Sequence, residues 1–285
     1  MGEVTIEVEV PGEGEADSLA IHYSAGSPAG AFSNGARELD GQLKGRLQRL
    51  ADGGELKSDL GATVVLLTDG EVKARRIVVA GVGKRDEIDA DALRTAASAV
   101  AHSVADVGGA LGWLLDESLP LSLEEQARAI VEGTMLGSYS PARWKTQEQP
   151  EAGVDKIVLY TSAGNGLAQT ASRSASVGRW VNVARDLANS PPNELTPETL
   201  AARAAELAGP KLGVEALDPA RIDELGMGAL SAVGRASSNG PRLIVLRYEP
   251  AQATRKDLVL GLVGDRKSTR LNSSHSVTSR MPSSA

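Results

Sequence analysis

Few side chains in this chain carry catalytic chemistry on their own. The 285 residues include no cysteine and only three histidines, His22, His102 and His275. The absence of cysteine excludes disulfides, thiolate zinc sites and cysteine nucleophiles. None of the histidines has a second histidine or a carboxylate at metal-ligand spacing, and no H-E-x-x-H motif occurs. We therefore interpret all three histidines as structural or incidental residues.

One serine and one glycine-containing turn invite comparison with known motifs. Ser190 precedes two prolines and lies in no G-x-S-x-G elbow, so we interpret it as part of a helix stop. A Ser-His-Asp triad stays open, because triads are assembled in space. The segment 81–84, GVGK, departs twice from the phosphate-binding loop, since Val78 and Arg85 replace its first Gly and its final Ser or Thr. We predict a strand-to-helix turn there.

Two small-residue turns, 226–228 and 234–237, would allow the backbone to approach a ligand closely. Tight packing between helices and strands is the simpler interpretation, and we prefer it. The residue types and their spacing thus predict no catalytic, cofactor-binding or metal-ligating residue in this chain.

The elements that would position such residues alternate between strand and helix in the first part of the chain. Apolar runs with a period of two, or rich in β-branched residues, predict strands, and 3.6-residue periodicity predicts helices. This alternation is typical of an α/β fold. The predicted strands are 4–10, 19–23, 63–67, 77–82 and 156–160, and the predicted helices are 39–50, 89–105 and 124–136.

A long helix is predicted over 167–188, and it would carry the chain from a first domain into a second. Pro191 and Pro192 end this helix, because proline lacks an N–H and restricts the residue before it. Thr196 is then the expected N-cap of a new helix, with Pro197 at its first position. The predicted apolar stripe of the long helix comprises Val177, Val181, Ala184 and Leu187.

The second part of the chain alternates short strands with a broken helix. Strands are predicted at 214–217, 243–246 and 258–263, and a helix that begins at Asp218 is interrupted by Gly226. Too few residues separate the last two strands for a parallel crossover. We therefore expect those two strands to form an antiparallel pair.

Charge and hydropathy restrict the environment and the partners. The net charge is −7, and because residues 265–285 contribute +3, the first 264 residues carry −10. Such a charge disfavours nucleic-acid binding, which depends on Lys and Arg neutralising phosphates. No apolar run reaches the length of a membrane span, and the N-terminus lacks the pattern of a secretory signal. We expect a cytoplasmic protein without membrane contact.

Residues 265–285 differ in composition from the rest of the chain. Nine of these 21 residues are Ser or Thr, and they show neither strand nor helix periodicity. This composition predicts disorder. The tail also resembles the translation of sequencing-adapter DNA, so we hypothesise that it is not part of the natural protein.

Several segments, taken in order, resemble the leucyl aminopeptidase family, also called the cytosol aminopeptidases. The strongest is RDLANSPPNELTP at 185–197, which is similar to the family pattern RDL-x-N-x-PPN-x-LTP. The matches run in order along residues 60–264, and residues 1–59 are compatible with them. The other segments are 225–230 with 233–237, 241–248 and, more weakly, 80–84 and 130–146.

The resemblance implies a fold and an activity. Family members are cytoplasmic, hexameric metallo-exopeptidases that release N-terminal amino acids, often leucine, from peptides. The implied organisation is a macrodomain-like α/β domain at 1–165, then a linker helix and the truncated start of an α/β catalytic domain at 166–264, followed by the tail. Two divalent ions, Mn²⁺, Zn²⁺ or Mg²⁺, bind the substrate and activate a water in such enzymes, and their ligands are a lysine and carboxylates.

The sequence departs from the family where the first metal ligands would stand. After Gly264 the family continues K-G-x-T-F-D-[ST]-G-G, in which the Lys and the Asp are ligands. Here Asp265 takes the position of the Lys and Arg270 that of the Asp, and a cation at a carboxylate position would repel a metal ion. We therefore expect no metal bound to this chain and carry over no site residue.

The chain is thus interpreted as an inactive N-terminal fragment of a hydrolase, a metal-dependent aminopeptidase. Two alternatives from other classes stay open. One is a macrodomain-like module that binds a nucleotide or an ADP-ribose-type ligand, for which no specific acidic partner is identified. The other is a DNA-binding role, as in some bacterial relatives, which the negative charge disfavours.

Overall fold

The computed structural model describes residues 4–12, 14–26, 32–141, 153–162, 166–250, 252, 255 and 258–264. The chain divides into two compact units, residues 1–186 and 187–285, and each is described by itself. The tail 265–285, and with it His275, Asp265 and Arg270, lies outside the described residues.

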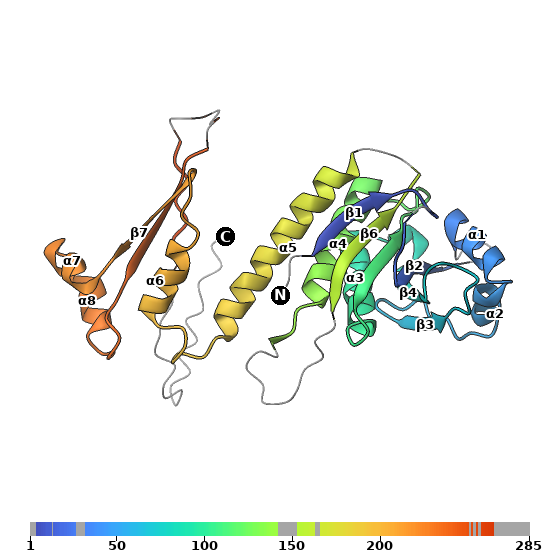
Figure 1. Cartoon of the computed structure of the whole chain (residues 1–285), viewed down its shortest axis with the longest axis horizontal. Coiled ribbons are helices and arrows are strands. Elements are labelled where there is room, and N and C mark those ends of the chain that lie inside the picture. Colours follow the sequence, from blue (N-terminus) through green and yellow to red (C-terminus); the bar gives the residue numbers. More distant parts are fainter. Residues whose placement is uncertain are drawn as a thin grey trace. The chain divides into compact units, whose positions relative to one another are not determined.

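The first unit is built on a six-stranded sheet with the order β1-β6-β5-β2-β4-β3 (Figure 1). Neighbouring strands run parallel except for β3, which pairs antiparallel with β4 at one edge. This mixed sheet confirms the predicted α/β fold. The strands are β1 (Thr5–Glu9), β2 (Ser18–Ala25), β3 (Thr63–Leu67), β4 (Arg76–Lys84), β5 (Gly109–Leu114) and β6 (Val154–Tyr160).

Helices cover both faces of this sheet, because parallel strands bury side chains on both sides. On β4, Ile77 and Val79 point to the face that α1 and α2 cover. Val78 and Ala80 point to the opposite face, which α3, α4 and α5 cover. These helices are α1 (Asn34–Gln42), α2 (Arg46–Asp52), α3 (Ala90–Ser103), α4 (Leu123–Gly137) and α5 (Leu167–Asn189).

Two predictions for the first unit differ from the structure. The single helix expected over 39–50 is broken into α1 and α2, because Lys44 and Gly45 adopt the left-handed conformation, with φ of 55° and 74°. The strand β5 was not predicted. Its sequence, GALGWL, contains two glycines and no β-branched residue, so the local pattern carries no strand signal.

The contact between α3 and α4 depends on glycine. A Cβ atom placed on Gly133 of α4 would lie 2.3 Å from the backbone oxygen of Arg94 and 2.8 Å from Cβ of Ala97, both on α3. On Gly137 it would lie 2.6 Å from the backbone of Ser98. The two helices are therefore packed backbone to backbone along this line, with no room for larger side chains.

The helix α5 has the predicted extent, but the predicted face is wrong. Val177 and Val181 are 49% and 38% exposed, and Ala184 is exposed as well. α5 turns a different face to the core because it approaches α4 closely at Gly178. A Cβ atom on Gly178 would lie only 2.7 Å from Cβ of Met135 on α4. The buried residues of α5 are Leu167, Ala171, Ser174, Gly178 and Asn182.

No helix in the described part of the chain has both the length and the apolar character of a membrane span.

The described residues of the second unit form three short helices and a two-stranded antiparallel sheet. As predicted, α6 begins after Thr196, whose hydroxyl accepts a hydrogen bond from the backbone N–H of Thr199, with Pro197 at the first position. Gly226, with φ of 69°, separates α7 from α8. The elements are α6 (Pro197–Ala205), β7 (Leu212–Leu217), α7 (Pro219–Glu224), α8 (Gly228–Gly234) and β8 (Leu243–Tyr248).

The strand predicted at 258–263, and its pairing with 243–246, are wrong for this structure. The partner of β8 is β7, with Val214 opposite Leu246. Residues 258–264 adopt no strand and are exposed, Val263 completely. An apolar, β-branched run of this kind forms a strand only where another strand offers it an edge and a covered face, and the described residues provide neither.

The close contact between α3 and α4 predicts unequal effects of two alanine substitutions. Gly133→Ala is expected to lower the free energy of unfolding by about 1–3 kcal/mol, because the added methyl group overlaps the backbone of α3. Gly41→Ala in α1 is the control. A Cβ there meets nothing within 4 Å, so this variant should gain up to about 1 kcal/mol. Urea unfolding followed by far-UV circular dichroism measures both, and equal effects would contradict the packing described.

Candidate functional site

The topology of the first sheet indicates where a site would form. From β2 the chain passes through α1, α2 and β3 to β4 on one side, whereas from β5 it passes through α4 to β6 on the other side. The adjacent strands β2 and β5 therefore send their connections in opposite directions. In open α/β sheets, ligands bind beyond the carboxyl ends of the strands at such a point.

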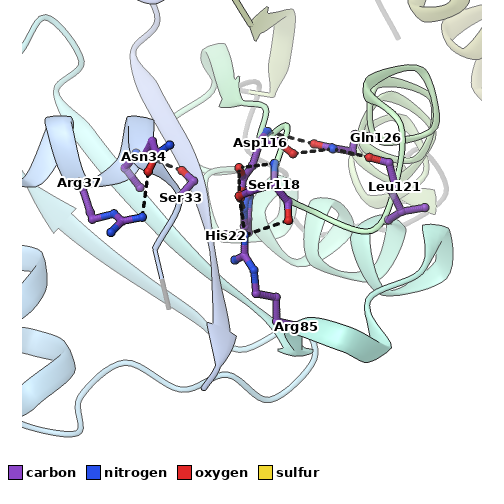
Figure 2. Close-up of polar contacts among 10 residues, drawn as sticks. His22, Ser33, Asn34, Arg37, Arg85, Asp116, Ser118, Leu121 and Gln126 are labelled. Carbon is purple, nitrogen blue, oxygen red and sulfur yellow. Dashed lines mark hydrogen bonds and ion pairs between the residues drawn. The ribbon is translucent and has the colours of Figure 1, made fainter. Parts of the chain in front are cut away.

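A cluster of polar side chains lies at this point, and we call it the Asp116 cluster. It comprises His22 on β2, Arg85 directly after β4, Asp116 and Ser118 after β5, and Gln126 on α4 (Figure 2). His22 and Asp116 are buried, with 3% and 5% of their surface exposed. The five residues come from four different segments, so none of the sequence spacings reveals the cluster.

Asp116 is the common partner in this cluster. Its Oδ2 lies 3.2 Å from Nε2 of His22 and 3.3 Å from Nη2 of Arg85. Its Oδ1 accepts a hydrogen bond from the backbone N–H of Ser118 at 2.9 Å and another from the Ser118 hydroxyl. Arg85 also donates to the backbone oxygen of Ser118 at 3.1 Å. The carboxylate is thus surrounded by donors and by one permanent positive charge.

Gln126 attaches this loop to α4. Its Oε1 accepts from the backbone N–H of Asp116 at 3.1 Å, and its Nε2 donates to the backbone oxygens of Asp116 at 2.8 Å and Leu121 at 3.0 Å. The buried amide therefore satisfies three backbone groups of the loop that follows β5. This fixes the carboxylate relative to the helix layer.

The surroundings of Asp116 set its protonation. Burial by itself raises the pKa of the Asp116 carboxyl, but the hydrogen bonds from His22 and Ser118 outweigh it. The pKa is therefore held well below the ordinary value of an aspartate, and the carboxylate is ionised at neutral pH. Such a group orients an imidazole and balances a guanidinium, but it is too weak a base to accept a proton near pH 7.

The cluster does not have the geometry of a catalytic triad. A triad requires a contact between the nucleophile and the histidine, which acts as the base. Here Ser118 donates to Asp116, and His22 also contacts Asp116. The cluster thus joins loops and neutralises charge, and it contains no activated nucleophile.

Two other sequence candidates in the first unit, the segment 81–84 and His102, contribute no side chain to this cluster. The segment 81–84 ends β4, and the backbone N–H groups of Gly81 and Gly83 donate to Ala62 and Ser58 of the same unit. These amides cannot cradle a phosphate. The strand-to-helix turn predicted at 81–84 lies further along the chain, because 81–84 still belong to β4 and the short helix Arg85–Glu87 follows them before α3. His102 is exposed in the last turn of α3.

The second unit holds the remaining candidates. Ser190 is buried in the bend directly after α5, where the helix stop was predicted. Gly234 packs tightly, since a Cβ there would lie 2.6 Å from Pro241, as expected for 234–237. The turn 226–228 differs, because a Cβ on Gly226 or Gly228 would meet nothing within 4 Å. The positive φ of position 226 therefore favours a glycine there, and close packing does not require one.

The described residues do not fit a dinuclear metal centre. Within the described ranges, no group of three or more His, Asp or Glu side chains is arranged to hold a metal ion. The carboxylate of Asp116 is already balanced by a cationic side chain, which would disfavour an additional positive ion. No catalytic step through a metal can be derived from these residues.

The Asp116 cluster predicts a stability effect that depends on pH. Asp116→Asn is expected to lower the free energy of unfolding by about 2–3 kcal/mol at pH 7, because a buried charge partner of His22 and Arg85 is lost. The folded pKa lies below the ordinary value of 3.8, so this stabilisation is fully present above that pH and is lost as the pH falls further. Denaturant unfolding from pH 7 to pH 2 should therefore show a constant difference between the two proteins above pH 3.8 and a difference that narrows below it.

A matched control is Asp91→Asn. Asp91 pairs with Arg94 at the exposed start of α3, so its loss should cost less than about 1 kcal/mol. An Asp116→Asn effect as small as that of the control, or one that is already lost above pH 3.8, would contradict the description of the cluster.

Known proteins resemble this chain over most of its length. A "Probable cytosol aminopeptidase" of Roseiflexus castenholzii is 37% identical over 215 residues, which are 72% of this chain and 43% of the relative. The "Cytosol aminopeptidase" of Pseudomonas aeruginosa is 30% identical over 250 residues, 85% of this chain and 50% of the relative. The chain therefore spans about half the length of these relatives.

Solved structures share the fold. A mutant of tomato leucine aminopeptidase matches with a TM-score of 0.75 and 24% identity, over 89% of this chain and 52% of that one. The bottromycin maturation enzyme BotP in complex with Mn matches with a TM-score of 0.64 and 24% identity, over 83% of this chain and 46% of that one.

Two family models match consecutive parts of the chain. Residues 28–148 match the N-terminal domain of the cytosol aminopeptidase family, and residues 182–265 match the catalytic domain of the same family. The two matches agree with the order of the motifs that suggested this resemblance. The chain belongs to the cytosol aminopeptidase family, of which it carries the N-terminal domain and part of the catalytic domain.

Proposed function

We propose that this chain is the N-terminal portion of a metal-dependent aminopeptidase that releases N-terminal amino acids, leucine above all, from peptides. The observation that carries the proposal is the match of the catalytic-domain model to residues 182–265, which include the segment RDLANSPPNELTP. The chain spans about half of its relatives, so this activity is proposed for the complete protein.

We further propose that the chain as given does not cleave peptides. In complete members of the family, two divalent ions polarise the scissile carbonyl and activate a water molecule. In this chain Asp265 and Arg270, which lie outside the described residues, replace the family's first Lys and Asp ligands. The lack of a carboxylate and histidine cluster among the described residues supports the same proposal.

The proposed organisation assigns a role to each part. Residues 1–165 are a macrodomain-like domain, residues 166–264 are the linker helix and the start of the catalytic domain, and residues 265–285 are not natural sequence. The complete protein would be a cytoplasmic homo-oligomer, a hexamer by analogy with its family, with peptides as substrates. The negative charge of the first 264 residues supports a role without nucleic acid.

The proposed lack of peptidase activity can be tested directly on the purified chain. Incubated with Mn²⁺ or Zn²⁺ and then with a leucyl anilide, it is expected to release no more amine than the metal alone. Calorimetry should likewise detect no binding of a metal pair. The cytosol aminopeptidase of Pseudomonas aeruginosa, assayed in parallel, is the positive control. Turnover clearly above the metal blank would refute the proposal of inactivity.

A chimera separates the family activity from the inactivity of this chain. Residues 265–285 are replaced by the continuation of the Pseudomonas aeruginosa relative, from its metal-ligand segment to its C-terminus. The chimera is expected to bind two metal ions and to cleave the leucyl anilide. A chimera that binds both ions and still releases no amino acid would contradict the proposed aminopeptidase activity.

The two units are expected to differ in resistance to proteolysis. The second unit rests on a two-stranded sheet, which is marginally stable by itself, and residues 258–264 expose an apolar segment. The first unit has a sheet covered on both faces, and part of α5 is buried in it. Limited trypsin digestion should therefore leave a core that ends near residue 186. Equal resistance through residue 264 would be the contrary result.

A further inference from the structure

The two edges of the first sheet differ in chemistry. β1, at one edge, carries Glu7 and Glu9 in the sequence TIEVE. β3, at the other edge, has the sequence TVVLL, and the stretch 60–68 contains no charged residue and no proline. Natural proteins usually protect an edge strand with charges, proline or a bulge. β3 pairs with β4 in a regular register and lacks these features within the strand.

The hydrogen bonds to β4 show which backbone groups of β3 point away from the sheet. At one end the carbonyl of Ala62 accepts from the N–H of Gly81, and at the other end the N–H of Thr68 donates to Arg75. In an antiparallel ladder every second residue bonds to the same neighbour. The even-numbered residues of β3 therefore bond to β4, and Thr63, Val65 and Leu67 direct their N–H and C=O groups to the free edge.

Two of these three residues, Val65 and Leu67, also expose apolar side chains. Val65 and Leu67 are 42% and 63% exposed, whereas Val64 and Leu66 point to the opposite face and pack against the core under α1 and α2. Outward backbone groups and exposed apolar side chains thus belong to the same residues. A strand added at this edge would bury both.

The edge is complementary to itself. When two copies of β3 are related by a two-fold axis at Val65, Val65 lies opposite its own copy and Thr63 lies opposite Leu67. Every residue with outward-directed groups then faces another such residue, and no charge faces a charge within the strand. The same arrangement of β1 would bring its glutamates close to those of the copy.

The acidic charges that follow β3 are partly balanced within one copy. Arg46 pairs with Asp69 and Glu71, and its guanidinium also donates to the backbone oxygen of Leu67 at 3.1 Å. That oxygen keeps a second lone pair for an N–H of the partner. Arg46 thus offsets one of the two acidic charges, and the charge that remains lies beyond the paired residues Thr63–Leu67.

We propose that β3 is a self-association edge, at which two copies of this chain pair antiparallel through Thr63–Leu67 and join their sheets into one. The occupant is a second copy because the edge matches its own chemistry in this register. Paired strands of five residues bury less than the roughly 1,200 Å² of a standard interface, so the dimer is weak and reversible. This association does not depend on the proposed peptidase activity.

Disulfide cross-linking tests the register. The chain has no cysteine, so each introduced thiol reports on one position. A hydrogen-bonded antiparallel pair places its Cα atoms about 5.5 Å apart, within the range of a disulfide. The full chain with Val65→Cys should cross-link to itself under mild oxidation. Leu67→Cys should cross-link only when mixed with Thr63→Cys, because its own copy lies about 14 Å away along the strand.

The matched control is Val177→Cys, which places a thiol at a comparably exposed valine of α5. Cross-linking of Val177→Cys, or of Leu67→Cys with itself, as fast as that of Val65→Cys would indicate random collision and overturn the proposal. Failure of Val65→Cys to cross-link faster than the control would overturn it as well.

A charge substitution provides a second measurement. Val65→Lys places two ammonium groups opposite each other at the two-fold axis, and it should raise the dimer dissociation constant at least about tenfold in sedimentation velocity. Val177→Lys should leave that constant unchanged, and circular dichroism verifies that both variants fold. Equal association of Val65→Lys and the unsubstituted chain would refute the pairing.

Discussion

Close approach of backbones is the constraint on which the first unit depends. The chain contains one phenylalanine and 3% aromatic residues, so its core consists mainly of alanine, valine, leucine and isoleucine. Small side chains fill a core at normal density only when the elements that carry them lie close together. Gly133 and Gly137 bring α4 to the backbone of α3, and Gly178 brings α5 to Met135. The same constraint explains why α5 packs through the face that carries Ser174 and Gly178 and leaves Val177 and Val181 exposed.

The carboxyl edge of the sheet is organised by electrostatics. At this edge a buried carboxylate, an imidazole and a guanidinium come from three different segments that share no helix or strand: the loop after β5, β2 and the segment after β4. Asp116 joins these segments because each of its two oxygens accepts from two donors, and Gln126 attaches its backbone to α4. This edge is where an α/β sheet ordinarily offers a ligand site. In this chain its charges are balanced internally.

The sequence predicted those features that local chemistry determines. The apolar runs located five of the six strands in the first sheet, and Thr196 with Pro197 located the start of α6. Features that depend on distant partners were not predictable. β5 is a strand because β2 and β6 flank it, although GALGWL carries no strand signal, and His22 meets Asp116 across 94 residues. Residues 258–263 have the composition of a strand but lack the neighbouring edge that would make them one.

The pairing of β1 with β6 has a consequence for the order of folding during synthesis. β1 is synthesised before the other strands described in its sheet, and its described neighbour is β6, with Thr5 opposite Lys156. At about 5–20 residues per second, β6 is synthesised roughly 8–30 s after β1. The four strands between them can associate in that interval, because β2, β4, β3 and β5 pair with one another. β1 therefore has no described partner strand to pair with until β6 has been synthesised, which allows the other strands of the sheet to pair before it.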